Sequence, residues 1–218
     1  MFENLSVQEL FPTPLWICDL TEAQARRLNA QLKARIAALI EPRPPIELGS
    51  TWQTDPVLHE LPEFADFIEI VTAAARGAFD FLGLSYESFE ITGCWANVNP
   101  RGGINSSHNH PNNYLSGVYY VQVPPGTGKI VFADPRPQAG VMMPTTQRYN
   151  KFTGNTITAD AKEGRMFLFP GWLFHSVPVN RSEDDRISIS FNVMFSNYTA
   201  TMSPPLWTGT APIRRRPG

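Results

Sequence analysis

The fold is indicated most clearly by one stretch near the C-terminal end, RISISFNVMFS, at residues 186–196. Every second residue from 187 to 195 is apolar and bulky, whereas the alternate set begins with Arg186 and continues through Ser188, Ser190 and Asn192. Successive side chains of a strand point to opposite faces, so this period of two predicts a β-strand. We expect its apolar face to pack on a second layer and its polar face to meet water or a wet cavity.

Outward from this stretch, three more runs favour strands, at 116–123, 129–134 and 165–170. Two helices are predicted before them, one from a capping box at Thr21 to the prolines that begin at Pro42, and one over 63–82, capped by Gly83. Their apolar stripes are Leu28, Leu32, Ile36 and Ile40 in the first, and Phe64, Ile68, Val71, Ala75, Ala78 and Leu82 in the second. Many short strands after two helices indicate a mainly β protein, an antiparallel sandwich or barrel with both helices packed on one sheet.

The composition excludes several classes of protein. The 218 residues carry 18 Lys+Arg and 20 Asp+Glu, a net charge of −2, which argues against a nucleic-acid partner bound through a basic face. Two cysteines provide neither a disulfide framework nor a Cys-rich zinc site. With no membrane-length apolar run and no visible leader, the chain is expected to be cytoplasmic and without a membrane partner. We expect a single domain over 1–218, with a helical support region at 1–85, a strand-rich core at 86–200 and a C-terminal extension at 201–218.

Three of the four histidines indicate a metal site. His108 and His110 are two residues apart, so on a strand both point to one face, and neutral imidazole binds iron, zinc, copper or nickel. His175 is predicted to join them. Arg186 follows 11 residues later and is expected to lie beside His175 across a hairpin. Ordinary exposed or core histidines would give the same pattern, and His59, which has no such neighbours, is interpreted as structural.

Four motifs then occur in a characteristic order: HNHPNNYLSGVYY at 108–120, FADPR at 132–136, FPGWLFHSV at 169–177 and RISISFN at 186–192. Together they resemble a family of bacterial and phage 2-oxoglutarate/iron(II) oxygenases, distantly similar to the prolyl hydroxylases. The resemblance runs from about residue 11 to Phe195. It implies a double-stranded β-helix, or jelly roll, in which residues 86–200 form the catalytic core and hold Fe(II) and the cosubstrate 2-oxoglutarate.

The resemblance also implies roles for single residues. His108 would be the first metal ligand and His175 the distal one. Arg186 would bind the far carboxylate of 2-oxoglutarate, with Ser188 beside it and Tyr120 touching the same group. An arginine fork suits a carboxylate because it forms two parallel charge-assisted bonds. Shared strand parity adds Ser116 and Asn192 to the candidate cosubstrate residues, and Trp95, Asn97 and Asn99 are expected to line the pocket from a neighbouring strand.

One position departs from the family pattern. The usual ligand triad has a carboxylate two residues after the first histidine, and here that residue is His110. Three neutral ligands leave an iron site one negative charge short. Three-histidine iron sites exist in other jelly-roll dioxygenases, but such sites also suit zinc, so iron, zinc and nickel stay open. Asp134 is either a carboxylate that approaches the metal or orients a histidine, or, as we favour, a turn residue before Pro135.

Two hypotheses of different classes follow. The first is a non-haem iron(II)- and 2-oxoglutarate-dependent oxygenase, a hydroxylase whose substrate is a small molecule or peptide. The second is a jelly-roll protein that binds a metal or a small acid without redox chemistry. A homodimer is left open.

Overall fold

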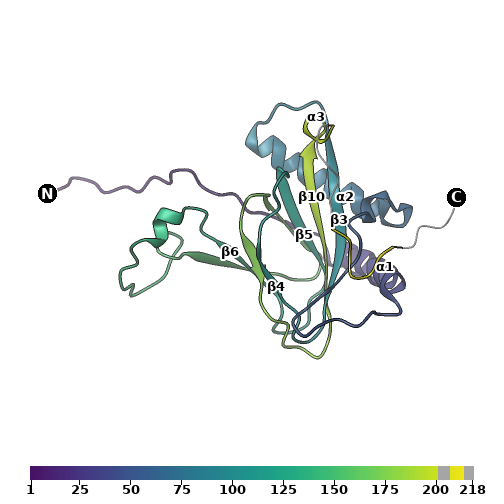
Figure 1. The fold of residues 1–218 in the computed structure, drawn as a ribbon. Helices are drawn as coiled ribbons and strands as arrows, with labels where there is room; N and C mark the ends of the chain where they lie inside the picture. The colour runs from purple at the N-terminus through teal and green to yellow at the C-terminus, as the bar shows by residue number, and fades with distance from the viewer. Residues whose placement is uncertain (201–206, 214–218) are drawn as a thin grey trace.

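The computed structural model describes residues 1–200 and 207–213. Within them, two antiparallel sheets form a mainly β fold with helices on one side (Figure 1). The larger sheet has six strands in the order β1-β8-β5-β10-β3-β2, and the smaller has four in the order β4-β9-β6-β7. The strands of the larger sheet are β1 (Trp16–Asp19), β2 (Trp52–Gln53), β3 (Phe89–Asn99), β5 (Leu115–Gln122), β8 (Arg165–Pro170) and β10 (Arg186–Phe195). Those of the smaller sheet are β4 (Asn105–His108), β6 (Lys129–Ala133), β7 (Thr156–Asp160) and β9 (His175–Val177).

Strand β10 lies inside the larger sheet, between β3 and β5, as its buried alternating pattern requires. Its apolar residues belong to the main hydrophobic core, together with the buried residues of the two long helices. Val118 and Tyr120 of β5 pack instead with Ile130 and Phe132 of β6, in a second cluster between the sheets. The predicted division of β10 into a helix-facing and a cavity-facing side is therefore confirmed.

The two predicted helices are α1 (Glu22–Ile40) and α2 (Ala65–Leu82), which cover the outer face of the larger sheet (Figure 1). The capping box of Thr21 and Gln24 is present, and Gly83 ends α2 in a left-handed conformation with φ 64°. Short 3₁₀ turns, η1 (Leu58–Glu60) and η2 (Pro62–Phe64), precede α2, so this helix begins two residues later than predicted.

The predicted stripe of α2 was partly wrong. Leu82 is exposed, whereas Phe67 and Phe79 are fully buried. The ring of Phe79 lies 5.1 to 6.0 Å, centroid to centroid, from four other aromatic rings: those of Tyr86, Phe89, Tyr114 and Phe195. The predicted positions already advance by 3.6 residues on average, so the helical period was right. The difference lies in the width of the buried face, which takes in Phe67 and Phe79 and ends before Leu82.

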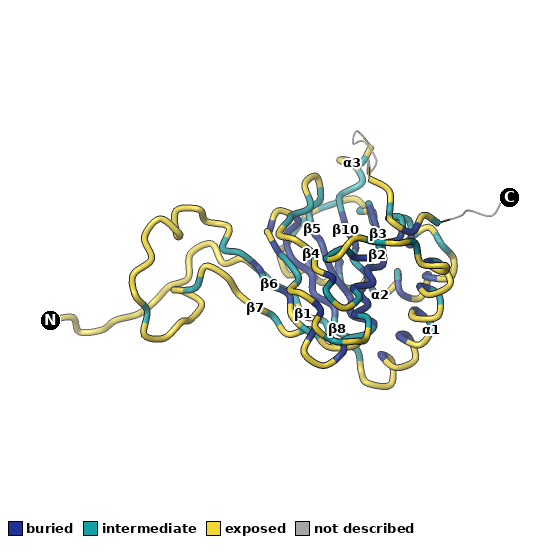
Figure 2. Tube along the Cα trace, turned by 60° about the horizontal axis from the view of Figure 1, so that its bottom comes forward, coloured by how far each residue is buried: buried dark blue, intermediate teal, exposed yellow. Residues whose placement is uncertain are grey.

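Two segments project together from the open side of the smaller sheet, and we call them the protruding arm: residues 1–14, and residues 134–155 between β6 and β7. Figure 2 shows both running away from the body of the molecule, almost entirely exposed. The second contains the short 3₁₀ turn η3 (Pro137–Gly140). Lys151 forms an ion pair with Glu9, which joins the two segments.

Residues 207–213, which we call the C-terminal strap, lie against β2. Ala211 donates its backbone N–H to the Gln53 carbonyl at 3.0 Å, and the Asp55 carboxylate accepts the backbone N–H groups of Gly209 and Ile213, each at 2.8 Å. The rest of the predicted C-terminal extension, 201–206 and 214–218, lies outside the described residues. A short helix, α3 (Ser196–Thr199), follows β10. Across the described ranges, no helix has both the length and the apolarity needed to cross a bilayer.

Candidate metal and cosubstrate site

Three histidines meet at one end of the smaller sheet. His108 ends β4 and pairs in register with His175, the first residue of β9, and His110 follows in the loop after β4. The backbone N–H of His110 is held by the Gly171 carbonyl at 2.8 Å. Each histidine offers one ring nitrogen to a group whose ligand atoms lie within 4.8 Å of one another. The sequence-based expectation that these three come together is met, although His110 reaches the group from a loop rather than from the strand.

The hydrogen bonds of two rings select their tautomer. The Nδ1 of His108 lies 2.7 Å from the Ser106 carbonyl oxygen, and the Nδ1 of His175 lies 2.9 Å from that of Leu173. A carbonyl can only accept, so Nδ1 must carry the proton in both rings. This leaves each Nε2 with its lone pair free, which is the state that a metal ligand requires.

Burial keeps two of the rings neutral. It lowers the pKa of His110 to about 3, with the neighbouring His175 and His108 adding to the effect. Burial also lowers the pKa of His175 to about 4, against the opposing hydrogen bond to Leu173. Both rings are therefore unprotonated at neutral pH and need lose no proton when they bind a metal.

Asp134 does not join the histidines. Its carboxylate accepts the backbone N–H of Arg136 at 2.9 Å and its guanidinium at 2.7 and 3.0 Å, and the guanidinium holds the pKa of Asp134 below its ordinary value. Among the described residues, the only cluster of three or more potential ligands is the histidine triad. The favoured interpretation of Asp134 as a turn residue agrees with these contacts.

Arg186 reaches the site from the opposite sheet. The expected hairpin between His175 and Arg186 is wrong: β9 pairs with β4 and β6, whereas β10 pairs with β3 and β5. The chain crosses from one sheet to the other between Val177 and Arg186. The two residues consequently face each other across the interior of the jelly roll and line the same cavity.

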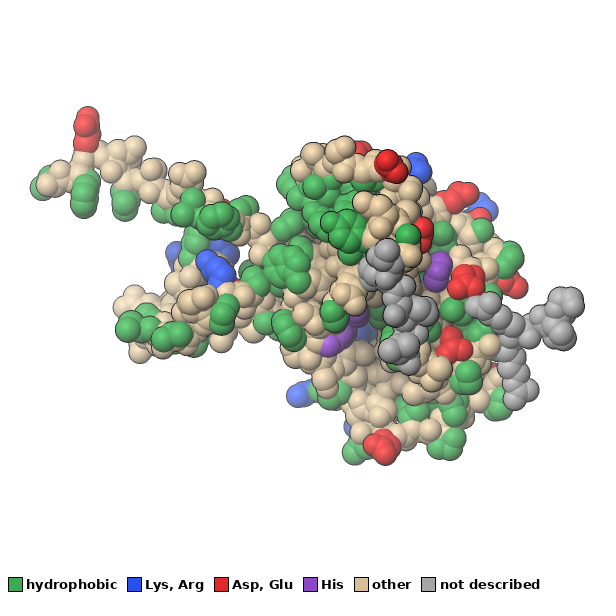
Figure 3. Space-filling view, turned by 45° about the horizontal axis from the view of Figure 1, so that its top comes forward, with side chains coloured by type: hydrophobic (Ala, Val, Ile, Leu, Met, Phe, Trp, Pro, Cys, Tyr) green, Lys and Arg blue, Asp and Glu red, His purple; other side chains and the backbone are tan. Residues whose placement is uncertain are grey.

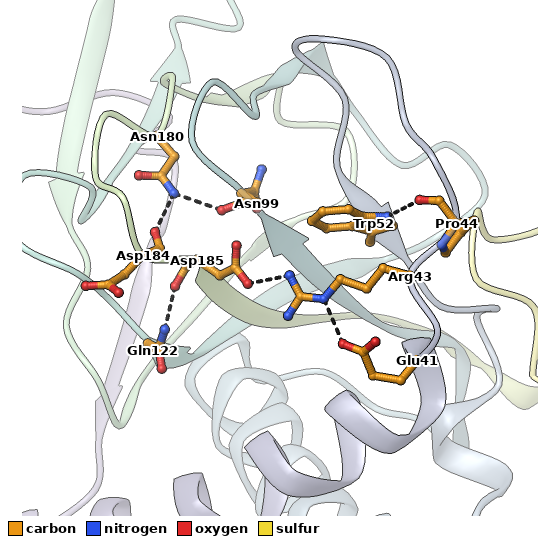
Figure 4. Close-up of polar contacts among 9 residues, drawn as sticks. All are labelled: Glu41, Arg43, Pro44, Trp52, Asn99, Gln122, Asn180, Asp184 and Asp185. Carbon is orange, nitrogen blue, oxygen red and sulfur yellow. Dashed lines mark hydrogen bonds and ion pairs between the residues drawn. The ribbon is translucent and has the colours of Figure 1, made fainter.

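The start of β10 is fixed by a network of polar contacts (Figure 4). Asp185 forms an ion pair with Arg43 at 2.7 Å, and its carbonyl accepts the side-chain amide of Gln122 at 2.7 Å. The amide of Asn180 donates to the carbonyls of Asn99 and Asp184, at 2.8 and 2.9 Å. The backbone on the N-terminal side of Arg186 is therefore held from three directions, which sets where its side chain enters the cavity.

Arg186 itself is buried without a compensating charge. Only 2% of the residue is exposed, its Nε has no hydrogen-bond partner, and no carboxylate within residues 1–200 and 207–213 pairs with it. The hydroxyl of the fully buried Tyr120 also lacks a partner. Burial raises the pKa of Tyr120 to about 12, against the lowering influence of Arg186, and burial lowers the pKa of Arg186. Unpaired buried groups of this kind are costly, so two together indicate a place prepared for an anion.

The other predicted site residues divide into two groups. Ser188 lines the cavity beside Arg186, and Trp95 and Asn97 line it from β3. Ser116 and Asn192 do not line it, since the Ser116 hydroxyl bonds the Asn192 side chain at 2.7 Å in a buried pair. Asn99 also lies outside the lining and donates to Thr51 and Asn105.

The comparison with protein families agrees with this geometry. Residues 93–192 match the family described as "Putative 2OG-Fe(II) oxygenase". The resemblance expected from the four motifs is confirmed. The matched segment runs from β3 to β10, so it contains all three histidines and Arg186. A search of the curated proteins found no match.

Solved structures of 2-oxoglutarate oxygenases share the fold. The epimerase SnoN from nogalamycin biosynthesis is 13% identical, with a TM-score of 0.58 over 94% of both chains. HygX from Streptomyces hygroscopicus, with nickel, 2-oxoglutarate and hygromycin B bound, is 10% identical, with a TM-score of 0.57 over 84% of both chains. A prolyl hydroxylase from Trichoplax adhaerens, in complex with a peptide, is 11% identical, with a TM-score of 0.57 over 87% of both chains. The predicted jelly roll is therefore confirmed.

Several residues in or near the cavity were missed from the sequence. Val118 and Val177 share strand parity with Tyr120 and His175, so the period of two alone was enough to find them. Gln53 had no such signal. It lines the cavity from β2, in a region expected only to support the core, and donates to the Asn97 side chain at 2.7 Å, which in turn donates to Ser190 at 3.0 Å. Trp207 of the C-terminal strap was also missed, and its ring centroid lies 5.4 Å from that of Trp95.

Proposed function

We propose that this protein is an iron(II)- and 2-oxoglutarate-dependent oxygenase that hydroxylates its substrate. One observation carries the proposal: three imidazoles face a buried, unpaired arginine across one cavity. The imidazoles would bind a metal, and the arginine would bind the free carboxylate of a dicarboxylate held by that metal. When bound, iron and 2-oxoglutarate together supply the oxidising power from dioxygen and release succinate and carbon dioxide.

The donor set fits a transition metal. His108, His110 and His175 would hold it through ring nitrogens, two of which are oriented by backbone carbonyls. Three protein ligands leave other metal positions open for a cosubstrate. Iron, nickel and zinc all accept imidazole, so the ligands alone do not select one metal.

The anion end of the cavity fits a carboxylate. Arg186 would pair with the far carboxylate of 2-oxoglutarate, and Tyr120 would donate its unpartnered hydroxyl to the same carboxylate. Ser188 lies two residues after Arg186, on the same face of β10. Ser116 and Asn192 already satisfy each other, so we assign them the support of β5 against β10. Placing the charge of 2-oxoglutarate here would compensate a guanidinium that otherwise stays buried alone.

The remaining lining has two tasks in this proposal. Val118, Ile130, Phe169 and Val177 give the cavity apolar walls that exclude water from the reacting groups. Trp95 and Asn97 line the cavity on the side of β3, and the ring of Trp95 contacts that of Trp207. HygX was solved with hygromycin B and the prolyl hydroxylase with a peptide, so both small molecules and peptides stay within the proposed substrate class. We assign this work to one domain over 1–218, with 86–200 as its catalytic core.

A second candidate function is favoured by the absence of a carboxylate ligand among the described residues. Three histidines without a carboxylate are also a zinc site. In that case the protein would hold a metal or a small acid and carry out no oxidation. The two functions separate on one measurement, the release of succinate from 2-oxoglutarate.

The test compares metal content, 2-oxoglutarate binding and succinate release in matched variants. His175→Ala should lose the metal, whereas His59→Ala, altered outside the triad, should keep it. Arg186→Ala should keep the metal but bind 2-oxoglutarate about 30- to several-thousand-fold more weakly, because removing one partner of a buried charge pair costs roughly 2–5 kcal/mol. Arg186→Lys should recover only part, since an ammonium cannot form the bidentate fork.

The controls assign each failure to one part of the proposal. Arg165→Ala removes an arginine of the same sheet that pairs with Asp19 away from the cavity, and should bind 2-oxoglutarate like the wild type. Full metal occupancy in His175→Ala would refute the ligand assignment. If metal-loaded wild type binds no 2-oxoglutarate at millimolar concentration, the non-redox function replaces the oxygenase.

A further inference from the structure

The protruding arm carries an unusual share of the exposed apolar side chains. Its two segments, 1–14 and 134–155, contain 11 of the 22 exposed large hydrophobic residues of the described chain, in 36 residues. In Figure 3, hydrophobic side chains follow the whole projecting part. The members are Met1, Phe2, Leu5, Val7, Leu10, Phe11, Val141, Met142, Met143, Tyr149 and Phe152. Scattered exposed hydrophobic residues are normal, but a concentration on one projection marks an interaction surface.

The total surface supports the same conclusion. The chain exposes 13899 Å², whereas a compact monomer of 24.4 kDa is expected to expose about 10,000 Å². The excess is several times the roughly 800 Å² that each partner contributes to a standard protein–protein interface. The extended segments therefore leave more surface open than a compact fold of this mass would.

Both sheets present an unpaired edge where the arm begins. Residues 1–14 lead directly into β1, and residues 134–155 lead directly into β7. Within the described ranges β1 pairs only with β8, and β7 only with β6, so each has a free side. Ile17 and Ile157 on these strands are each 54% exposed. A free strand edge with apolar side chains is a surface on which another chain can pair.

The charges of the arm decide what kind of partner it fits. The two segments hold three acidic residues and three basic ones, Glu3, Glu9, Asp134, Arg136, Arg148 and Lys151, and two of the pairs are already formed within the arm. A balanced surface has no net attraction for nucleic acid or an anionic bilayer. It also lets two identical surfaces approach without like-charge repulsion, which a symmetric pair requires.

We propose that the protruding arm packs against a second copy of this chain, so that the protein is a two-fold dimer. In such a dimer each arm covers the apolar surface and free edges at the base of the other. The second segment of the arm begins at Asp134, two residues after Phe132, whose ring centroid lies 6.2 Å from that of His175. Between them, the Ala133 N–H donates to the Phe174 carbonyl. The dimer contact therefore lies next to the metal-binding end of the smaller sheet.

The experiment measures the molar mass of the full chain by light scattering and by sedimentation, over a wide concentration range. The wild type is expected at about twice 24.4 kDa. Met142→Asp and Phe152→Asp place a charge on side chains that are 82% and 58% exposed, so folding is not at risk. Two-fold symmetry introduces each charge twice, and each variant should weaken the dimer at least about 100-fold. Leu48→Asp, at a side chain 97% exposed outside the arm, is the matched control and should stay dimeric.

Folding of every variant is checked by circular dichroism and by metal content, which a surface charge should leave unchanged. Deleting residues 1–14 should also give a folded monomer. A wild type that is monomeric at all concentrations overturns the proposal, as does open-ended association or a dimer that survives both arm substitutions. A wild-type monomer that gains mass only on anionic vesicles would overturn it in favour of a membrane surface.

Discussion

The two sheets of this protein are built for different tasks. The larger sheet is covered on its outer face by α1 and α2, and its inner strands are almost fully buried. Among the described residues, no helix covers the smaller sheet. Its strand β7 is mostly exposed, and it carries the projection of residues 134–155 (Figure 2). Arg186, which we propose binds 2-oxoglutarate, lies on the covered sheet, and the three histidines lie on or beside the open one. The covered sheet holds the buried guanidinium of Arg186 in a fixed position, whereas the open sheet leaves the histidines on the side from which a metal ion could reach them.

The largest effect is expected when one aromatic ring is removed from the covered side of the larger sheet and one from the arm of the smaller sheet. Phe79→Ala deletes a fully buried side chain between α2 and the larger sheet, where it contacts four aromatic rings. The free energy of unfolding should fall by about 3–5 kcal/mol. Phe152→Ala removes an exposed ring of the arm and should change it by less than about 0.5 kcal/mol when measured in the monomer. Equal losses in denaturant titrations would contradict the division.

A smaller effect is expected from adding one methyl group. A Cβ at Gly117, on β5, would lie 2.2 Å from the Phe191 ring and 2.9 Å from the Phe167 carbonyl oxygen. Gly117→Ala should therefore cost about 1–3 kcal/mol in overpacking of the larger sheet. Gly140→Ala, in the arm, meets nothing within 4 Å and should be neutral. Thermal unfolding of the two variants side by side measures the difference, and a neutral Gly117→Ala would show that the covered sheet is loosely packed.

The smallest effect is expected at the edge of the larger sheet, where β1 is joined to β8. The Arg165 guanidinium binds both oxygens of Asp19, at 2.7 and 2.8 Å, and lowers the pKa of Asp19 from 3.8 to about 2. A carboxyl with a lowered pKa stabilises the fold above its ordinary pKa, and this contribution is lost as the pH falls from 3.8 toward 2. Because the pair is partly exposed, Asp19→Asn should cost no more than about 1 kcal/mol at neutral pH. Urea titrations across this acid range should show a flatter pH dependence for Asp19→Asn, and an unchanged slope would contradict the assignment.

Much of the fold could be predicted because the spacing of apolar residues along the sequence indicates which face of a helix or strand is buried. The alternation at 186–196 predicted both the strand and the side that faces the helices, and the capping box at Thr21 and the glycine at position 83 marked helix ends through backbone geometry. The pairing of strands was harder. His175 and Arg186 are close in sequence, and a hairpin was the simplest connection, but the jelly roll sends the chain to the other sheet. Pairing is decided by contacts between distant residues, which local patterns do not encode.

Site residues could be predicted when their residue type is rare in the chain, and they were missed when the type has many ordinary roles. Three of only four histidines meet in one cluster, so scarcity itself was a signal. Glutamine and tryptophan residues have many ordinary roles, and neither Gln53 nor Trp207 lies in a motif. Their positions depend on the C-terminal strap returning to β2, a contact between residues more than 150 positions apart.

The strap is also joined by a hydrogen bond to a residue that lines the cavity. The carbonyl of Gln53 is held by Ala211 of the strap, its side chain holds Asn97, and Asn97 holds Ser190 on the strand that carries Arg186. Four residues on four separate stretches of chain are thus connected by successive hydrogen bonds. Loss of the strap would therefore remove a hydrogen bond from Gln53, and Gln53 is linked through Asn97 to the strand that carries Arg186.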